Sequence, residues 1–317
     1  MATLEEAAEE LSRMGDSASL ERKFSGIDTI EKGSTVLEED ISKSIEPREP
    51  GKVAGVDGGL VKKRYAAGDV VATRAVSAIF SFPGPRAEYI PGSDPVPEFH
   101  VSSSGDSRGL ERKAETERLR AEVETALEAL ERADRVFMDG SVVPGYLDDG
   151  EVLGRYEELF EKASKGSLAG VVEDSHGLKL SDIMEQKTGV ELGDIRDTVL
   201  MDALLQEGER SFVRRYSDSP VEHPVLKNIS DRHANRINTF YVRLSSRDVP
   251  LRVDYYGDVE DADIIAGEML SLKSSESYTV PSPVVEADRR AKIPEKHLKR
   301  LEKRFSPDLR RRDRRTF

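Results

Sequence analysis

Two aspartates in the sequence follow apolar runs and are themselves followed by glycine. Asp57 ends the run in KVAGVDGG (52–59), and Asp139 ends the run in VFMDGS (136–141). Such runs predict buried strands that stop at the aspartate, and Gly58 and Gly59 allow a sharp turn and the close approach of another group. A carboxylate there is costly without a compensating partner, so the repeated pattern favours a metal ion or an active site. A single aspartate of this kind more often caps its own turn.

Carboxylates grouped in this way suit divalent metal chemistry. Mn²⁺ and Mg²⁺ prefer a few carboxylate oxygens together with water and substrate phosphate, and two such ions can promote phosphodiester cleavage. The glutamate-rich helix predicted at 110–133 offers a further ligand. Glu122 borders the apolar stripe of this helix beside Leu119 and Val123, so it can face the edge of a sheet. The other glutamates of this helix are interpreted as solvated surface residues.

Composition excludes several classes of protein. The 317 residues suffice for one large domain or two small ones, and 61 acidic against 48 basic residues argue against a simple nucleic-acid-coating protein. The absence of cysteine excludes disulfides, zinc–thiolate sites and a cysteine nucleophile. No stretch approaches the ~18 apolar residues of a membrane span, and the N-terminus lacks the apolar region of a signal peptide. We therefore expect a cytoplasmic protein without membrane contact.

The order of predicted elements indicates an α/β fold. Strands are predicted around Asp57, at 69–82, near 99–103, at 135–139 and at 168–172, with helices at 110–133 and 152–165. Short links make the first three strands antiparallel, and helical links make the last two parallel. This is the order of a ribonuclease H-like mixed sheet flanked by helices. Its first strand is central, so Asp57, a glutamate of the helix and Asp139 should converge.

Three segments are expected along the chain. Residues 1–50 are interpreted as an appended N-terminal helical arm that ends at Pro47 and Pro50. Residues 51–305 form the main domain, with further strands near 210–216, 239–244 and 251–255 and helices at 262–272 and 284–305. Residues 306–317 are a basic C-terminal tail; such tails are usually solvated, and the alternative is an arm that contacts phosphates.

Several motifs together resemble one protein family. VAGVDGG, RAEVE, VFMDGS, LAGVVEDSH and ESYTVPSPVVEADRRAKI are similar to stretches of the NurA family of archaeal and bacterial nucleases, over about residues 50–300. The resemblance implies a nuclease domain with a ribonuclease H-like core at 51–305. It implies Mn²⁺-dependent 5′→3′ exonuclease and endonuclease action on DNA during double-strand-break end resection. It also implies a homodimer that docks on the hexameric ATPase HerA, and we assign the arm to dimer or ATPase contacts.

The same resemblance gives roles to four residues. Asp57 corresponds to the first metal-binding aspartate of the family, and Glu122 and Asp139 resemble the next acidic pair. Tyr278 resembles a late tyrosine of the family. We expect a catalytic role for all four, and metal binding for the three carboxylates.

The chain departs from the family pattern at two positions. A lysine is expected just after the fifth strand, where the sequence has Glu173 and Asp174, and Lys179 is the candidate substitute. A histidine is expected in the last helix, where the sequence has Asp288. Because ribonuclease H-like sites often take a further carboxylate from a late helix, we expect Asp288 to bind metal.

Two other classes of function remain open. Paired Asp–Gly strand ends also mark the phosphate loops of ATP-binding phosphotransferases of the actin–hexokinase fold. That fold needs two duplicated domains, for which Asp57 and Asp139 are too close in sequence, and the P-loop pattern G-x-x-x-x-G-K-[ST] is absent. The missing lysine and histidine suggest, as a third class, a catalytically weak or inactive adaptor of the ATPase.

Overall fold

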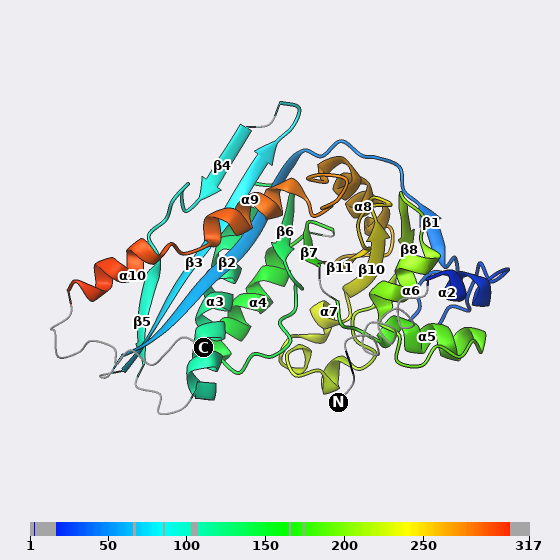
Figure 1. Cartoon of the computed structure of the whole chain (residues 1–317), viewed down its shortest axis with the longest axis horizontal. Coiled ribbons are helices and arrows are strands. Elements are labelled where there is room, and N and C mark those ends of the chain that lie inside the picture. Colours follow the sequence, from blue (N-terminus) through cyan, green and yellow to red (C-terminus); the bar gives the residue numbers. More distant parts are fainter. Residues whose placement is uncertain are drawn as a thin grey trace.

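A single mixed sheet organises the protein. The computed structural model describes residues 3, 17–65, 68–84, 86–102, 107–164, 166–173 and 175–304. Within these residues eleven strands form one sheet with helices on both faces (Figure 1). The sheet order is β1-β8-β10-β11-β7-β6-β2-β3-β4, with β5 paired to β3 and β9 paired to β10. Residues 4–16 of the expected arm and the tail at 306–317 lie outside the described residues.

A long antiparallel hairpin forms one half of this sheet. Strands β2 (Lys52–Tyr65) and β3 (Gly68–Ser81) pair along their whole length, with Asp57 opposite Val76. The prediction that the first strand stops at Asp57 is therefore wrong, since Gly58 and Gly59 continue the strand. Glycine adopts both turn and extended conformations, and the β-branched residues of β3 supply a partner strand along the whole run.

Strands on either side of the hairpin follow the expected order. Strands β4 (Arg86–Ile90) and β5 (Glu98–Ser102) pair with opposite ends of β3, and only the second of them was predicted. Strand β6 (Arg135–Asp139) lies parallel to β2, and β7 (Leu168–Val172) lies parallel to β6. The strand that carries Asp57 is therefore internal and its neighbour carries Asp139, as the sequence predicts.

Antiparallel strands of the second half extend the sheet beyond β7. Strand β11 (Leu251–Tyr256) pairs with β7, and β10 (Ile237–Arg243) pairs with β11. Three short strands complete this edge: β8 (Glu209–Ser211), β9 (Arg214–Arg215) and β1 (Ser42–Ser44).

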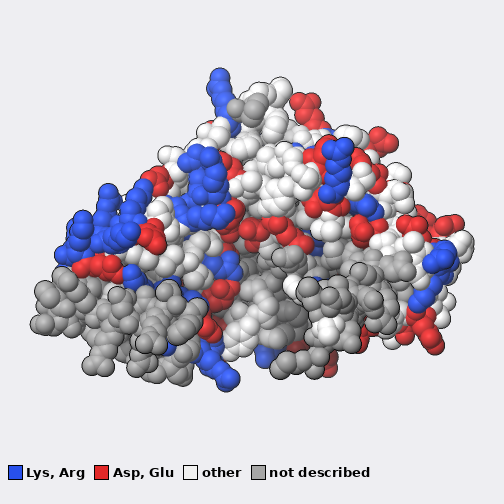
Figure 2. Space-filling model, viewed as in Figure 1, with Lys and Arg blue, Asp and Glu red and all other residues white. Residues whose placement is uncertain are grey.

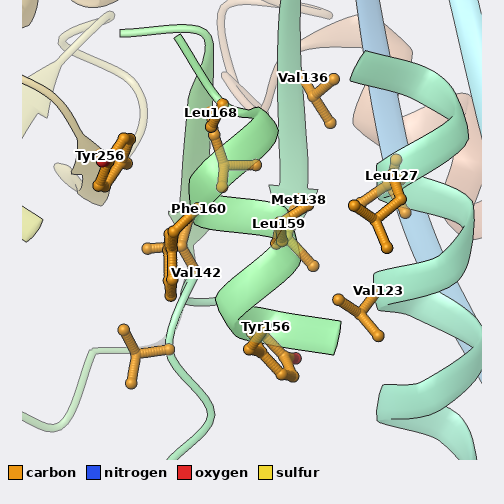
Figure 3. Close-up of a cluster of buried hydrophobic side chains, with 14 of the residues drawn as sticks. Val123, Leu127, Val136, Met138, Val142, Tyr156, Leu159, Phe160, Leu168 and Tyr256 are labelled. Carbon is orange, nitrogen blue, oxygen red and sulfur yellow. The ribbon is translucent and has the colours of Figure 1, made fainter. Parts of the chain in front are cut away.

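Alternation along the strands sends neighbouring side chains to opposite faces of the sheet. Met138 packs with α3 (Ser107–Leu130) and α4 (Gly150–Lys162), in the cluster drawn in Figure 3. Its neighbour Phe137 packs on the other face with α8 (Asp261–Leu272) and α9 (Ser282–Ala291). A third cluster surrounds Tyr241 and joins α2 (Ser17–Lys23), α5 (Lys179–Thr188) and α6 (Asp197–Leu204). Among the described residues no helix has the length and apolar character to cross a membrane.

The last predicted helix is divided into two. In place of one helix at 284–305, α9 ends at Ala291 and α10 (Glu295–Glu302) begins after Pro294. Proline lacks a backbone N–H and restricts the residue before it, so the helix cannot continue through this point. The other helices of this half are the short α7 (Asp231–Ala234) and two 3₁₀ turns, Pro220–Glu222 and Leu226–Asn228.

The described part of the N-terminal arm belongs to the fold. Leu20, Phe24 and Ile41 are buried in the cluster around Tyr241, and β1 adds an edge strand by pairing with β8. For residues 17–50, the prediction of an appended helical arm is therefore wrong. Its spaced apolar residues resemble those of an amphipathic arm, but here they cover β10 and the helices beside it, and only α2 is helical.

Removing one of these buried side chains should destabilise the whole domain. Phe24 is 4% exposed, so we expect Phe24→Ala to lower the free energy of unfolding by about 3–5 kcal/mol. Phe99→Ala on β5, where the side chain is 37% exposed, is the matched control and should have a much smaller effect. Denaturant unfolding measures both, and equal midpoints for Phe24→Ala and the parent would show that residues 17–50 are appended.

Candidate metal centre

Three aspartates from separate elements meet at one point of the sheet. They are Asp57 in the middle of β2, Asp139 at the end of β6 and Asp288 on α9, and one oxygen of each lies within 4.8 Å of the others. The first two are neighbours because β2 and β6 are parallel and pair with Val56 beside Met138. The third arrives because α9 packs across β2 and β3 (Figure 1).

Glycines of β2 allow this close approach of α9. A Cβ added at Gly55 would lie 2.1 Å from the carbonyl carbon of Pro283, and one at Gly59 would lie 2.1 Å from the carbonyl oxygen of Ala291. Alternate residues of a strand face the same side, so Asp57 faces α9 together with these two glycines. The close approach predicted from the glycine pair therefore occurs, but along an extended strand and with no turn.

Glu122 reaches the site from the opposite face of the sheet. A Cβ added at Gly58 would lie 2.5 Å from the Glu122 side chain, so the missing side chain of this glycine leaves room for the carboxylate. Glu122 is 4% exposed and accepts a hydrogen bond from Arg118, one turn earlier on α3. It does not belong to the group of three aspartates, but its charge and those of Asp57 and Asp139 act on one another.

Burial and mutual repulsion disfavour the ionised carboxylates. Burial raises the pKa of Glu122 to about 8, against the charge of Arg118, and that of Asp139 to about 7. The charge of Asp57 raises both pKa values further. The pKa of Asp57 itself is raised by burial, which outweighs the hydrogen bond from the Gly58 N–H. A bound cation would relieve this cost by stabilising the charged forms.

The three aspartates fit a hard divalent ion. Two ligands of one Mg²⁺ ion with bonds near 2.1 Å are at most about 4.2 Å apart, and the three oxygens lie within 4.8 Å of one another. The donors are all carboxylate oxygens, the set preferred by Mg²⁺ and Mn²⁺. Asp57, Asp139 and Asp288 could therefore hold such an ion.

Tyr278 lies beside this group through Glu173. The Tyr278 hydroxyl donates a hydrogen bond of 2.8 Å to Glu173 Oε1. Burial raises the pKa of Tyr278, and the neighbouring carboxylates Glu173, Asp139 and Asp288 raise it further. The charge of Glu173 also raises the pKa of Asp139. Glu173 occupies the position where the family pattern predicts a lysine. The neighbouring Asp174 lies outside the described residues.

The lysine near the aspartates is one that sequence reasoning missed. Lys179 is the first residue of α5, and its charge lowers the pKa of His223. Figure 1 shows that α5 lies far from α9. Lys292, just after α9, donates a hydrogen bond of 2.7 Å to Asp288 Oδ2. That bond raises the pKa of Lys292, and the charges of Asp57 and Asp139 add to the effect. The i,i+4 spacing of Asp288 and Lys292 is the sequence signal that could have found it.

One groove reaches the centre, and a hollow lies beside Lys292. A groove of about 730 Å³ runs from Asp139 and Glu122 between α3 and the loop after β6, and Arg112 and Lys113 also line it. A shallower hollow of about 460 Å³ lies beside Lys292, and its other lining residues include Arg74, Arg289 and Arg290.

Comparison with known proteins identifies the family. The family model of the NurA domain matches residues 51–293. This chain belongs to the NurA domain family. The resemblance found in the sequence motifs is thus confirmed, and the aspartate centre lies in the matched NurA region. No curated protein sequence matches the chain.

Solved structures of NurA proteins share the fold. The chain is similar to the NurA nuclease from Sulfolobus solfataricus, with 15% identity, 94% of each chain covered and a TM-score of 0.65. It is also similar to a NurA bound to dAMP and manganese, with 12% identity, 84% of this chain and 91% of that chain covered, and a TM-score of 0.53. Another NurA with manganese has 12% identity and a TM-score of 0.56, with 94% and 99% covered.

The raised pKa values predict how stability depends on pH without metal. The pKa values of Glu122 and Asp139, about 8 and 7, exceed the ordinary 4.5 and 3.8, so the folded protein binds more protons than the unfolded chain. Below the pKa values of the unfolded chain, the two protonated carboxyl groups add to the free energy of unfolding. This contribution is lost as the pH rises through the pKa values of the folded protein. We expect Glu122→Gln to remove part of this loss, on the order of 2–4 kcal/mol. Melting temperatures of chelator-treated protein across this pH range measure it, and parallel profiles for variant and parent would contradict the expectation.

Proposed function

We propose that this protein is a metal-dependent DNA nuclease, with Mn²⁺ or Mg²⁺ as cofactor. The observation that carries the proposal is the convergence of Asp57, Asp139 and Asp288, whose oxygens lie within 4.8 Å of one another in a half-buried site. Membership in the NurA domain family supports it, as do the related NurA structures that contain manganese and dAMP. The order β4-β3-β2-β6-β7, with β2 central, supports a ribonuclease H-like core.

The residues of the centre divide the work of phosphodiester hydrolysis. Asp57, Asp139 and Asp288 would hold the metal, with Glu122 as a further carboxylate behind Asp57. When bound, the metal supplies positive charge that activates a water and stabilises the phosphate oxygens.

The neighbours of the metal ligands act on the substrate phosphate and on the attacking water. Lys292 adds a positive charge beside Asp288, in place of the lysine that the family pattern predicts after the fifth strand. Tyr278 orients Glu173 beside Asp139, so this carboxylate is placed to accept the proton of the attacking water. Lys179, distant from the group, has no part in this mechanism.

Basic residues around the centre provide a path for DNA. Figure 2 shows Lys and Arg side chains gathered over α9 and α10, where Arg289, Arg290 and Lys292 belong to the hollow beside the centre. On the other side, the groove along α3 contains Arg112 and Lys113 beside Glu111 and Glu115. A strand that passes from one to the other would bring a phosphate to the aspartates.

Partners complete the proposed function. The chain carries 61 acidic and 48 basic residues, so its overall charge repels DNA, and local basic patches or a partner must supply the attraction. We propose a homodimer that works with a HerA-type hexameric ATPase in 5′→3′ end resection, on the basis of family membership. A catalytically inactive adaptor of that ATPase is the alternative that a cleavage assay excludes.

Neutralising the central aspartate should abolish cleavage and leave the fold intact. Asp57→Asn removes a metal ligand, so we expect the Mn²⁺-dependent cleavage of linear DNA to fall by orders of magnitude. The metal-free protein should melt at the same or a higher temperature, because the substitution removes a buried charge that repels Asp139 and Glu122. Glu88→Gln, an exposed carboxylate on β4, is the control. A destabilised but fully active Asp57→Asn would refute the metal centre, and an inactive parent, with or without the ATPase, would favour the adaptor.

Lys292 should affect the rate of cleavage more than metal binding. We expect Lys292→Ala to lower the rate at saturating Mn²⁺ by about 10–100-fold, because a positive charge near the phosphate is lost. The Mn²⁺ concentration for half-maximal rate should stay equal or decrease, since a cation that competes for Asp288 is gone. Lys296→Ala on α10, where Lys296 lies 3.8 Å from Asp94, is the matched control. If Lys292→Ala cleaves at an unchanged rate, Lys292 only pairs with Asp288 at the end of α9 and has no role in cleavage.

A further inference from the structure

A second group of metal-binding side chains lies between α4 and α7, apart from the aspartate centre. Glu157 and Glu161 are one turn apart on α4, so they share a face of that helix. His233 belongs to α7, and one ligand atom of each of the three residues lies within 4.8 Å of the others. No pattern in the sequence indicated this group, because His233 is distant in the chain from the two glutamates.

His233 presents a buried nitrogen without a partner to these carboxylates. Its side chain is 7% exposed, and Nδ1 lies 2.8 Å from the Tyr256 hydroxyl. Nε2 has no hydrogen-bond partner among the described residues and lies 3.7 Å from Glu157 Oε1. A buried polar atom left unpaired is unfavourable, so its position toward two glutamates needs an explanation.

Aromatic packing fixes the direction of this imidazole. The ring centroid of His233 lies 6.2 Å from that of Phe160 and 5.7 Å from that of Tyr256. Both aromatic side chains belong to the cluster of Figure 3, where they are labelled. When Nδ1–H donates to the Tyr256 oxygen, the lone pair of Nε2 points toward the carboxylates, as a metal-ligating histidine requires.

We propose that Glu157, Glu161 and His233 form a second divalent metal site, of a kind that Zn²⁺ occupies, which fastens α7 to α4. One imidazole nitrogen and two carboxylates form a ligand set that suits zinc, with water in the fourth position. The segment that it fastens carries Val225, Leu226 and Ile229, which are buried against the same core. The site is thus separate from the aspartate centre and independent of the proposed nuclease activity.

Existing contacts prepare the site and also compete for it. Glu157 accepts hydrogen bonds from the backbone N–H of Ser230, at 3.0 Å, and from its hydroxyl, so one carboxylate is already oriented toward α7. Arg232 pairs with Glu161 and lies 3.8 Å from Glu157. The Arg232 side chain is 64% exposed, so it can move into solvent when a metal replaces its charge.

Zinc titration of the full-length protein tests the site. The aspartate centre is first disabled by Asp57→Asn and Asp139→Asn, and the protein is stripped of metal with a chelator. We expect calorimetry to show a Zn²⁺ site and thermal melts to show stabilisation by Zn²⁺. Glu161→Gln and His233→Gln should each weaken Zn²⁺ binding by about tenfold or more. Arg232→Gln should strengthen it, because the competing charge is removed.

Controls separate a metal site from a simple ion pair. Glu158→Gln, on the same helix and paired with Arg155 at 2.9 Å, should leave the Zn²⁺ affinity unchanged. If His233→Gln fails to fold, Glu161→Gln decides the matter, since the Glu161 side chain is 48% exposed. The proposal is overturned if the parent with the disabled centre binds no Zn²⁺, or if Glu161→Gln binds it as tightly as Glu158→Gln does.

Discussion

The docking of α9 directly on the backbone of β2 is the constraint on which the site depends. No side chain separates them, because Gly55 and Gly59 face the helix. A methyl group at either glycine would collide with the backbone at one end of α9. Asp57 lies between the two glycines, so the same approach brings Asp288 within reach of it. The parallel pairing of β2 with β6 adds Asp139.

Buried charges elsewhere in the protein show how unusual this centre is. Asp254 is fully buried, and burial alone would raise its pKa, but Arg252 at 2.6 Å and the Thr239 hydroxyl lower it. Arg210 is similarly buried and pairs with Glu38 and Asp263. At the centre, the pKa values of Glu122 and Asp139 are raised. Carboxylates kept costly in a folded protein cluster at functional sites, and this supports the metal centre proposed above.

The rest of the chain supports the centre from a distance. Helix α3 carries both Glu122 and Arg118, so it delivers a carboxylate through the gap at Gly58 together with its counter-charge. The second half extends the sheet from β7. At its far edge, β1 of the N-terminal segment pairs with β8. This explains why residues 17–50 carry so many apolar side chains although the NurA match begins at residue 51.

Local pattern in the sequence determined most strands and helices, and it also placed Asp57 and Asp139 on neighbouring strands. The predicted bounds of 135–139 and 168–172 agree with β6 and β7, because a short apolar run between polar ends has few alternatives. Only the tertiary structure decided that β2 continues past Gly58, because an extended glycine needs the partner strand β3 to be distinguished from a turn. It also decided that Lys292, and not Lys179, lies with the aspartates, because α9 docks on strands that are more than two hundred positions away, as in the hydrogen bond from Arg74 to the Lys292 carbonyl.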